Sequence, residues 1–147
     1  MSQVPRLFTV DEANALVPQL QLELAQVAKL RGDLTAAIEA LGGADTAVAI
    51  LQKGAPAPAG RDAEAEELKA LAARIQEIVG RIGALGAVVK DLEAGLVDFY
   101  SVRDGEPVFL CWQLGEPLVA HWHPVDEGFS GRQPIEGVEY EPPQYPN

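Results

Sequence analysis

Apolar residues recur at steps of three and four positions along two long stretches of the chain. This spacing places a single apolar stripe on one face of an α-helix. The first stripe consists of Leu20, Leu24, Val27, Leu30, Leu34, Ile38 and Leu41. The second stripe consists of Ala65, Leu68, Leu71, Ile75, Ile78, Ile82 and Leu85. Two helices of similar length joined by a connector predict a long antiparallel helical hairpin over residues 9–86.

The first helix has a well-marked start and an internal proline. Thr9 and Glu12 have the spacing of a capping box, in which each side chain accepts a hydrogen bond from the other residue's backbone N–H. Pro18 has no backbone N–H and disfavours the helical conformation of the residue before it. We therefore expect a short helix over residues 10–17, followed by a kink or a restart at Pro18.

The connector between the two helices is rich in alanine, glycine and proline over residues 44–60. Such a composition favours a flexible segment, with one helical turn over residues 46–51 as the alternative. Asp62 is a natural N-cap, so the second helix is expected to begin at Arg61 or Asp62.

After Gly86 the apolar period changes from the helical spacing to an alternation of two. Residues 96–102 alternate, and the strand formers of residues 108–112 follow an Asp104-Gly105 pair that is typical of a two-residue hairpin turn. Residues 118–123 form a third strand-like run, which ends at a proline. The C-terminal part is therefore predicted to be a three-stranded antiparallel β-meander.

Together these elements predict an α+β fold in a single domain over residues 1–135. The helical hairpin occupies residues 9–86, and the meander with a glycine-rich loop occupies residues 87–135. Residues 136–147 are acidic and rich in proline, so we expect an extended or disordered tail.

The Asp104-Gly105 turn fixes the pairing of the first two strands, and it places Asp98 directly opposite Cys111. The length of the next turn is not fixed by the sequence, so the register of the third strand stays open. If that turn has two residues, His121 and His123 lie on the face opposite Cys111, and a change of one residue in the loop moves both onto the Cys111 face.

Composition and charge narrow the class of protein. The 147 residues are 48% hydrophobic and 22% charged, which is typical of a globular domain. No apolar run reaches the length of a membrane span, and the single cysteine permits no internal disulfide, so we expect a cytoplasmic protein. The formal net charge is −11, with 11 acids and two arginines after Lys90. This excess of acids argues against nucleic acid as a partner.

Side chains that can ligate, titrate or stack are concentrated in residues 111–134, which contain the only cysteine, both histidines and both tryptophans. His121 and His123 have the spacing of a two-histidine chelate, and Glu116 is a nearby carboxylate, so these three are candidate ligands of a divalent metal such as zinc. The alternative is that the histidines only make hydrogen bonds at the edge of the core. Cys111 and Trp112 are further candidate ligand-binding residues.

Two more candidates have structural alternatives. Cys111 is a potential nucleophile with His121 or His123 as its base, but its acidic and apolar surroundings favour a buried small side chain. Arg132 ends a glycine-rich loop and is expected to pair with a carboxylate that holds this loop against the sheet. Its forked guanidinium suits bidentate pairing, and binding of an anionic ligand is the alternative.

Apolar stripes and aromatic side chains also predict contacts between proteins. Tyr100, Phe109 and Trp122 are expected on an outer sheet face that is too apolar to remain exposed. We therefore expect a homodimer, or a protein partner, bound through the helical hairpin or this outer face.

The segments RLFTVDEANALVPQL and VKDLEAGLVDFYSVRDGEPVFLCWQLGEPLVAHWHPVDEGFSGRQPI resemble a bacterial family catalogued as domain of unknown function 2203. The resemblance covers residues 6 to about 135. It implies no established reaction. His123 fits the family's Trp-His position, whereas His121 stands where the family often has an aromatic residue. This shifts attention from the two-histidine chelate to the following residues: Asp98, Cys111, Glu116, His123 and Arg132.

The sequence thus favours a binding or interaction module without turnover of its own and without a cofactor. The alternative is a metal-dependent enzyme, for instance a hydrolase, with a site around His123, Asp98 and Glu116. A hydrolytic metal site requires about three protein ligands and one position open to solvent.

Overall fold

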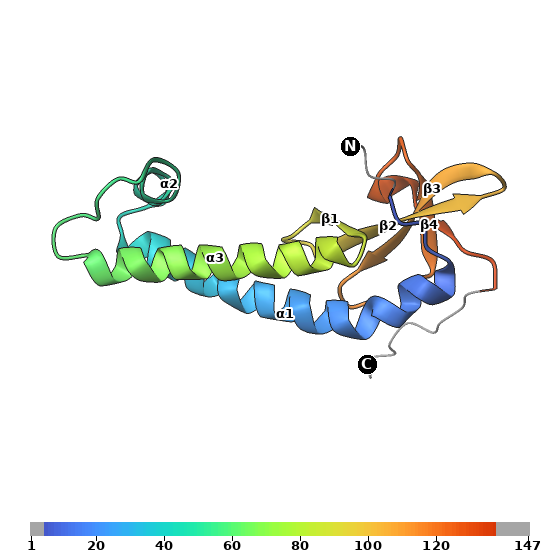
Figure 1. The fold of residues 1–147 in the computed structure, drawn as a ribbon, viewed down its shortest axis with the longest axis horizontal. Coiled ribbons are helices and arrows are strands. Elements are labelled where there is room, and N and C mark those ends of the chain that lie inside the picture. Colours follow the sequence, from blue (N-terminus) through green and yellow to red (C-terminus); the bar gives the residue numbers. More distant parts are fainter. Residues whose placement is uncertain (1–4, 138–147) are drawn as a thin grey trace, which may run out of the picture. The chain divides into compact units, whose positions relative to one another are not determined.

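The computed structural model describes residues 5–137, in which three α-helices precede a five-stranded antiparallel sheet (Figure 1). The helices are α1 (Val10–Ala40), α2 (Ala44–Lys53) and α3 (Asp62–Ala84). The strands are β1 (Ala87–Asp91), β2 (Leu96–Arg103), β3 (Glu106–Gln113), β4 (His121–Pro124) and β5 (Gln133–Pro134). The α+β class is therefore confirmed.

The chain divides into two compact units. The helical unit consists of Ala25–Arg81, and the sheet unit combines the residues up to Leu24 with those from Ile82 onward. Among the described residues, no individual helix has the length and apolar composition to cross a membrane, and a bent pair formed by α1 and α2 meets that criterion by length and composition only.

The helical unit contains the hairpin that the two apolar stripes predict. Its core includes six buried residues from all three helices and the α1–α2 junction: Ala37, Leu41, Ala47, Ile50, Ala65 and Leu68. The prediction of a flexible connector over residues 44–60 was wrong for its first half, because Ala44–Lys53 form helix α2. Ala47 and Ile50 are the buried residues of α2, so burial of this small apolar face outweighs the weak local pattern.

The start of α1 has the predicted capping box. The Thr9 backbone N–H donates to Glu12 Oε1 at 2.9 Å, and the Glu12 N–H donates to Thr9 Oγ1 at 3.1 Å. The helix does not end at Pro18 but continues through it to Ala40. Figure 1 shows α1 changing direction within its first turns, as expected where a proline removes a backbone hydrogen bond.

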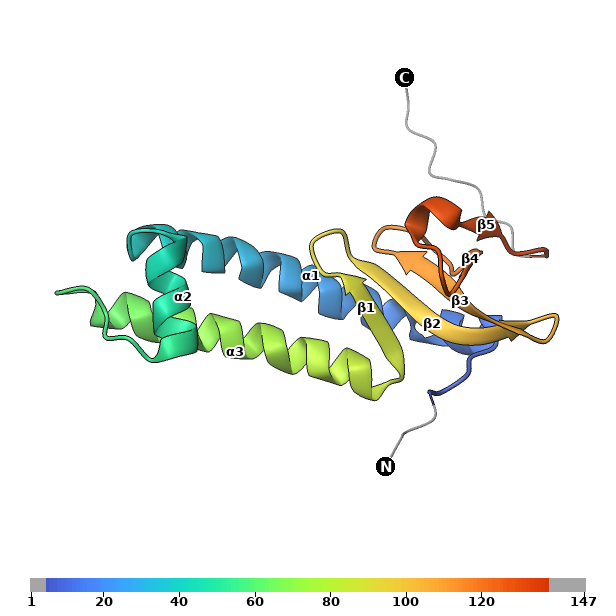
Figure 2. The same cartoon turned by 90° about the horizontal axis from the view of Figure 1, so that it is seen from above.

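The sheet has the order β1-β2-β3-β4-β5, which Figure 2 shows from above. The prediction of three strands identified β2, β3 and β4 and missed both outer strands. β1 has five residues with a register shift between Val89 and Asp91, and β5 has only two residues. Segments this short carry too little alternation to be recognised from sequence.

The register of β2 and β3 is the predicted one. Asp104 and Gly105 have φ values of 52° and 80°, as a turn of the I′ type requires, and Asp98 lies opposite Cys111. The open question about β4 is also resolved. His121 pairs with Cys111 and Trp122 with Leu110, so the two histidines share the Cys111 face and Trp122 lies on the other.

The expectation that Tyr100, Phe109 and Trp122 share an outer sheet face was wrong for Trp122. Phe109 is buried beneath neighbouring side chains, with the Tyr100 ring centroid at 4.6 Å and the Lys90 ammonium at 4.3 Å. Trp122, the third member of the expected patch, projects from the opposite face. Association through this face stays a prediction, without Trp122 as part of it.

The other face of the sheet forms the core of the sheet unit. Phe8 packs edge-on against Phe99 at 5.0 Å, and its backbone N–H donates to the carbonyl of Tyr100 on β2 at 2.8 Å. Trp112 and Val97 are also fully buried. The segment before α1 thus contacts β2 and leads the first turns of the helix onto the sheet.

Candidate functional site

Three predicted site residues meet on the Cys111 face of the sheet. Asp98 on β2, Cys111 on β3 and His123 on β4 each contribute one donor atom, and these atoms all lie within 4.8 Å of one another. The three residues are 1%, 0% and 3% exposed. The register of two strand pairs is therefore enough to gather a carboxylate, a thiol and an imidazole in the interior.

His123 uses both of its ring nitrogens. Nδ1 lies 2.8 Å from the carbonyl oxygen of Pro124, and Nε2 lies 2.9 Å from Asp98 Oδ2. A carbonyl can only accept, so Nδ1 carries a hydrogen and Nε2 is the atom that faces the carboxylate. Neither nitrogen is directed at Cys111 as a base.

Burial, with a smaller contribution from the nearby Asp98 carboxylate, raises the pKa of the Cys111 thiol to about 12. The Arg132 guanidinium acts in the opposite direction with a smaller effect. The isolated protein therefore holds a thiol and no thiolate at neutral pH. The hypothesis that Cys111 is a nucleophile with a histidine base is not supported by this geometry.

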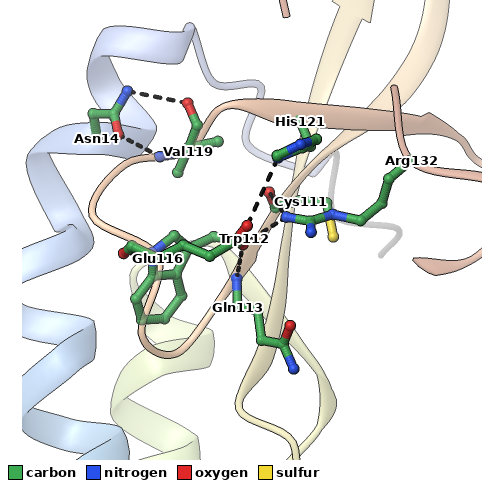
Figure 3. A network of polar contacts seen from close by, with 8 residues as sticks. All are labelled: Asn14, Cys111, Trp112, Gln113, Glu116, Val119, His121 and Arg132. Atoms are coloured by element: carbon green, nitrogen blue, oxygen red, sulfur yellow. Dashed lines mark hydrogen bonds and ion pairs between the residues drawn. The ribbon is translucent and has the colours of Figure 1, made fainter. Parts of the chain in front are cut away.

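Glu116, in the connection between β3 and β4, organises a second polar group next to the first (Figure 3). Its Oε1 accepts hydrogen bonds from the Gln113 backbone N–H at 2.7 Å and from Arg132 Nη2 at 2.5 Å. Its backbone carbonyl accepts from the indole Nε1 of Trp112 at 2.9 Å. Trp112 is thus a buried core residue that fixes the turn and is not exposed to a ligand.

Arg132 pairs with a carboxylate as expected, and this carboxylate belongs to Glu116 in the β3–β4 connection. The Arg132 and Glu116 side chains are 13% and 16% exposed, and Arg132 Nη2 also donates to the carbonyl of Cys111 at 3.3 Å. The guanidinium lies 4.6 Å from the ring of Phe129, within its own loop. The expected bidentate geometry was wrong, because one nitrogen makes both contacts.

The predicted metal set of His121, His123 and Glu116 is not assembled. His121 Nδ1 lies 3.7 Å from Glu116 Oε2, while His123 points to Asp98 instead. Burial and the adjacent Arg132 guanidinium lower the pKa of His121, and Glu116 partly offsets them. Among the described residues, the metal-capable group is formed by Asp98, Cys111 and His123.

Asn14 is a site residue that the sequence did not reveal. Its Oδ1 accepts from the Val119 backbone N–H at 2.6 Å, and its Nδ2 approaches the Val119 carbonyl at 3.4 Å (Figure 3). This side chain ties α1 to the loop that carries Glu116. An asparagine in the first turns of a helix gives no signal for a partner more than 100 residues away.

A cavity of about 570 Å³ lies at the end of the sheet where β2 turns into β3. Its apolar wall is formed by Pro107, Val108, Trp122, Pro124 and Val125. The Arg103 guanidinium lies 4.7 Å from the Trp122 ring centroid, and the buried Trp122 Nε1 has no hydrogen-bond partner among the described residues. The sequence pattern gave no sign of this cavity, because it favoured Trp122 on the other face of the sheet.

Comparison with known proteins identifies a family. The sequence profile of a family described as an uncharacterized conserved protein (DUF2203) matches residues 6–135. No curated protein and no solved structure matches the chain.

Proposed function

The chain belongs to the DUF2203 family of uncharacterized conserved proteins, and from its geometry we propose that it is a binding module that holds a small organic molecule without converting it. The observation that carries this proposal is the cavity of about 570 Å³ beside Trp122. Ligand sites of this kind are concave and mostly apolar, with a few polar groups that orient the ligand, and they measure about 300–1,000 Å³.

The chemistry of the wall defines the class of ligand. The apolar side chains of Val108, Pro124 and Val125 favour an apolar body.

The charges around the cavity restrict the ligand further. Three carboxylates and one guanidinium contribute to its lining: Asp104, Glu106, Asp126 and Arg103. Their formal sum is −2, and the guanidinium already lies over the Trp122 ring. The ligand is therefore neutral or cationic, because an anion would meet an excess of negative charge.

The buried polar group supports the absence of turnover. A metal-dependent hydrolase around His123, Asp98 and Glu116 needs a position open to solvent, but His123 and Asp98 are both buried. Glu116 is engaged by Arg132 and by the Gln113 backbone. We also propose a cytoplasmic location, which accords with the buried free thiol of Cys111.

Titration with Nile red, a neutral fluorescent dye with an apolar body and a carbonyl acceptor, tests the proposal. We expect saturable binding with an increase in dye fluorescence. The Val125→Glu variant places a carboxylate on the cavity wall, so its affinity for the dye should fall by about tenfold or more.

A matched control is available in the helical unit. Val125 and Val48 are 46% and 44% exposed, so Val48→Glu makes the same change at nearly the same exposure in a residue that does not line the cavity. It should leave dye affinity unchanged, and an anionic anilinonaphthalene sulfonate should bind the wild type more weakly than Nile red. Equal affinities of the two valine variants for Nile red would refute this site.

A further inference from the structure

The buried group of Asp98, Cys111 and His123 has the composition of a metal site and not of an ordinary core. The three residues come from three adjacent strands, and none is more than 3% exposed. Their donor atoms fall within 4.8 Å of one another. Zinc bonds of about 2.0–2.3 Å place ligand atoms roughly 3.3–3.8 Å apart. The widest separation must therefore shrink by about 1 Å, while the 2.9 Å between His123 Nε2 and Asp98 Oδ2 must open slightly.

The orientation of His123 matches that of a metal-bound imidazole. Histidines that ligate metals almost always donate their other ring N–H to a carbonyl or a carboxylate. Here Nδ1–H donates to the Pro124 carbonyl at 2.8 Å, which leaves Nε2 on the side of Asp98, within 4.8 Å of the other two ligand atoms. The backbone of β4 thus fixes the tautomer that a metal requires.

Asp98 supplies a second, independent indication. Its Oδ2 contacts His123, but its Oδ1 is buried and has no hydrogen-bond partner among the described residues. A buried carboxylate oxygen without a donor is unusual in a folded protein. A bound cation would satisfy it.

The formal charges of the region favour a divalent ion. A thiolate, a carboxylate and a neutral imidazole contribute −2, while Arg132 and Glu116 cancel each other in their own pair. Sulfur and imidazole ligands select a borderline metal, and they exclude magnesium and calcium, which prefer oxygen.

We propose that Asp98, Cys111 and His123 bind one zinc ion that joins β2, β3 and β4. All three protein ligands are buried, so no substrate reaches the ion and its role is structural, with a water molecule in the fourth position. This site shares no residue with the proposed ligand cavity, so the two proposals succeed or fail separately.

The test uses the full chain without a histidine tag. Because the site is buried, the protein is unfolded with guanidinium and a chelator, and it is then refolded with zinc or with cobalt. We expect one zinc per chain by mass spectrometry of the metal. We also expect the near-ultraviolet thiolate-to-cobalt charge-transfer band, which only a sulfur ligand produces.

Variants identify the ligands. Cys111→Ser should abolish the charge-transfer band. Loss of an outer-shell partner typically weakens metal affinity by about 10- to 100-fold. His123→Gln removes a direct ligand, so it should weaken zinc affinity by more than that. His121→Gln is the matched control, because it removes the neighbouring imidazole on the same face and should retain the metal. The cobalt spectrum of the wild type decides the question even if a variant fails to fold. Two results with the wild type overturn the proposal: refolding without stoichiometric metal, or a cobalt complex without the thiolate band. The proposal also fails if His121→Gln loses as much zinc affinity as His123→Gln.

Discussion

Replacing Arg132 with alanine measures how strongly the C-terminal loop is anchored to the sheet. The change removes the ion pair with Glu116 and the hydrogen bond to the Cys111 carbonyl. Exposed ion pairs contribute about 0–1 kcal/mol to stability, whereas breaking a buried pair costs about 3–5 kcal/mol. With side chains only 13% and 16% exposed, this pair lies close to the buried limit.

The remaining contacts of Glu116 reduce the loss of stability that the Arg132→Ala change causes. Its carboxylate keeps the hydrogen bond from the Gln113 backbone N–H at 2.7 Å after Arg132 is removed. We therefore expect Arg132→Ala to lower the free energy of unfolding by about 3 kcal/mol, at the lower end of the buried range. With an m-value of about 2 kcal/mol/M, the urea midpoint falls by about 1.5 M.

Arg103 provides a matched control within the same sheet unit. It also lies against an aromatic ring, but its ion pair with Glu136 spans 3.9 Å between side chains that are 34% and 93% exposed. Arg103→Ala should therefore cost only about 0–1 kcal/mol. Equal costs for the two alanine variants would refute the reasoning that burial decides the strength of the pair.

The Arg132→Lys variant tests whether the forked shape of the guanidinium matters for the ion pair with Glu116. Because a single nitrogen of Arg132 makes both contacts, Arg132→Lys should lose less than half of what Arg132→Ala loses. A Glu116→Gln change in the Arg132→Ala background completes a double-mutant cycle, which isolates the energy of the pair from the packing of the guanidinium.

Four further expectations follow from the same region and from the helices. Asn14→Asp should cost about 1–2 kcal/mol in urea unfolding, because the aspartate cannot donate to the Val119 carbonyl and places a charge there. Metal-free native protein should leave Cys111 unmodified by iodoacetamide at pH 8, since burial raises its thiol pKa to about 12, and alkylation should appear only on unfolding. The pKa of His121 is lowered in the folded protein, so as pH falls the imidazole becomes protonated in the unfolded chain before it does in the folded one. The free energy of unfolding should therefore decline as pH falls below 6.5, and His121→Gln should flatten that decline. Light scattering should show a dimer at micromolar concentration, and a monomer would exclude association through the helical hairpin.

Local signals predicted those parts of the fold that short-range chemistry determines. The Thr9–Glu12 capping box, the two helical stripes and the Asp104-Gly105 turn each depend on residues close together in sequence. The turn also determined the β2–β3 register, and with it the pairing of Asp98 with Cys111. This part of the candidate site followed from sequence because a two-residue turn leaves no freedom in register.

The rest depends on contacts that no local pattern encodes. The long connection between β3 and β4 is held by Glu116 hydrogen bonds and by Asn14, so the face of the histidines follows from tertiary contacts. Helix α2 forms because the Ile50 side chain is buried in the core of the helical hairpin. The Trp122 cavity and the approach of His123 to Asp98 both result from that unpredicted register of β4.

The two outer strands of the sheet also affect how the chain behaves among other copies of itself. An edge strand exposes unpaired backbone groups, which can template further strands and lead to fibrils. Here β1 has a register shift between Val89 and Asp91, and β5 has only two residues, the second of which is Pro134. Both features interrupt the regular row of donors and acceptors that an incoming strand needs. Neither edge of the folded sheet therefore offers a regular template to a strand from another copy of the chain.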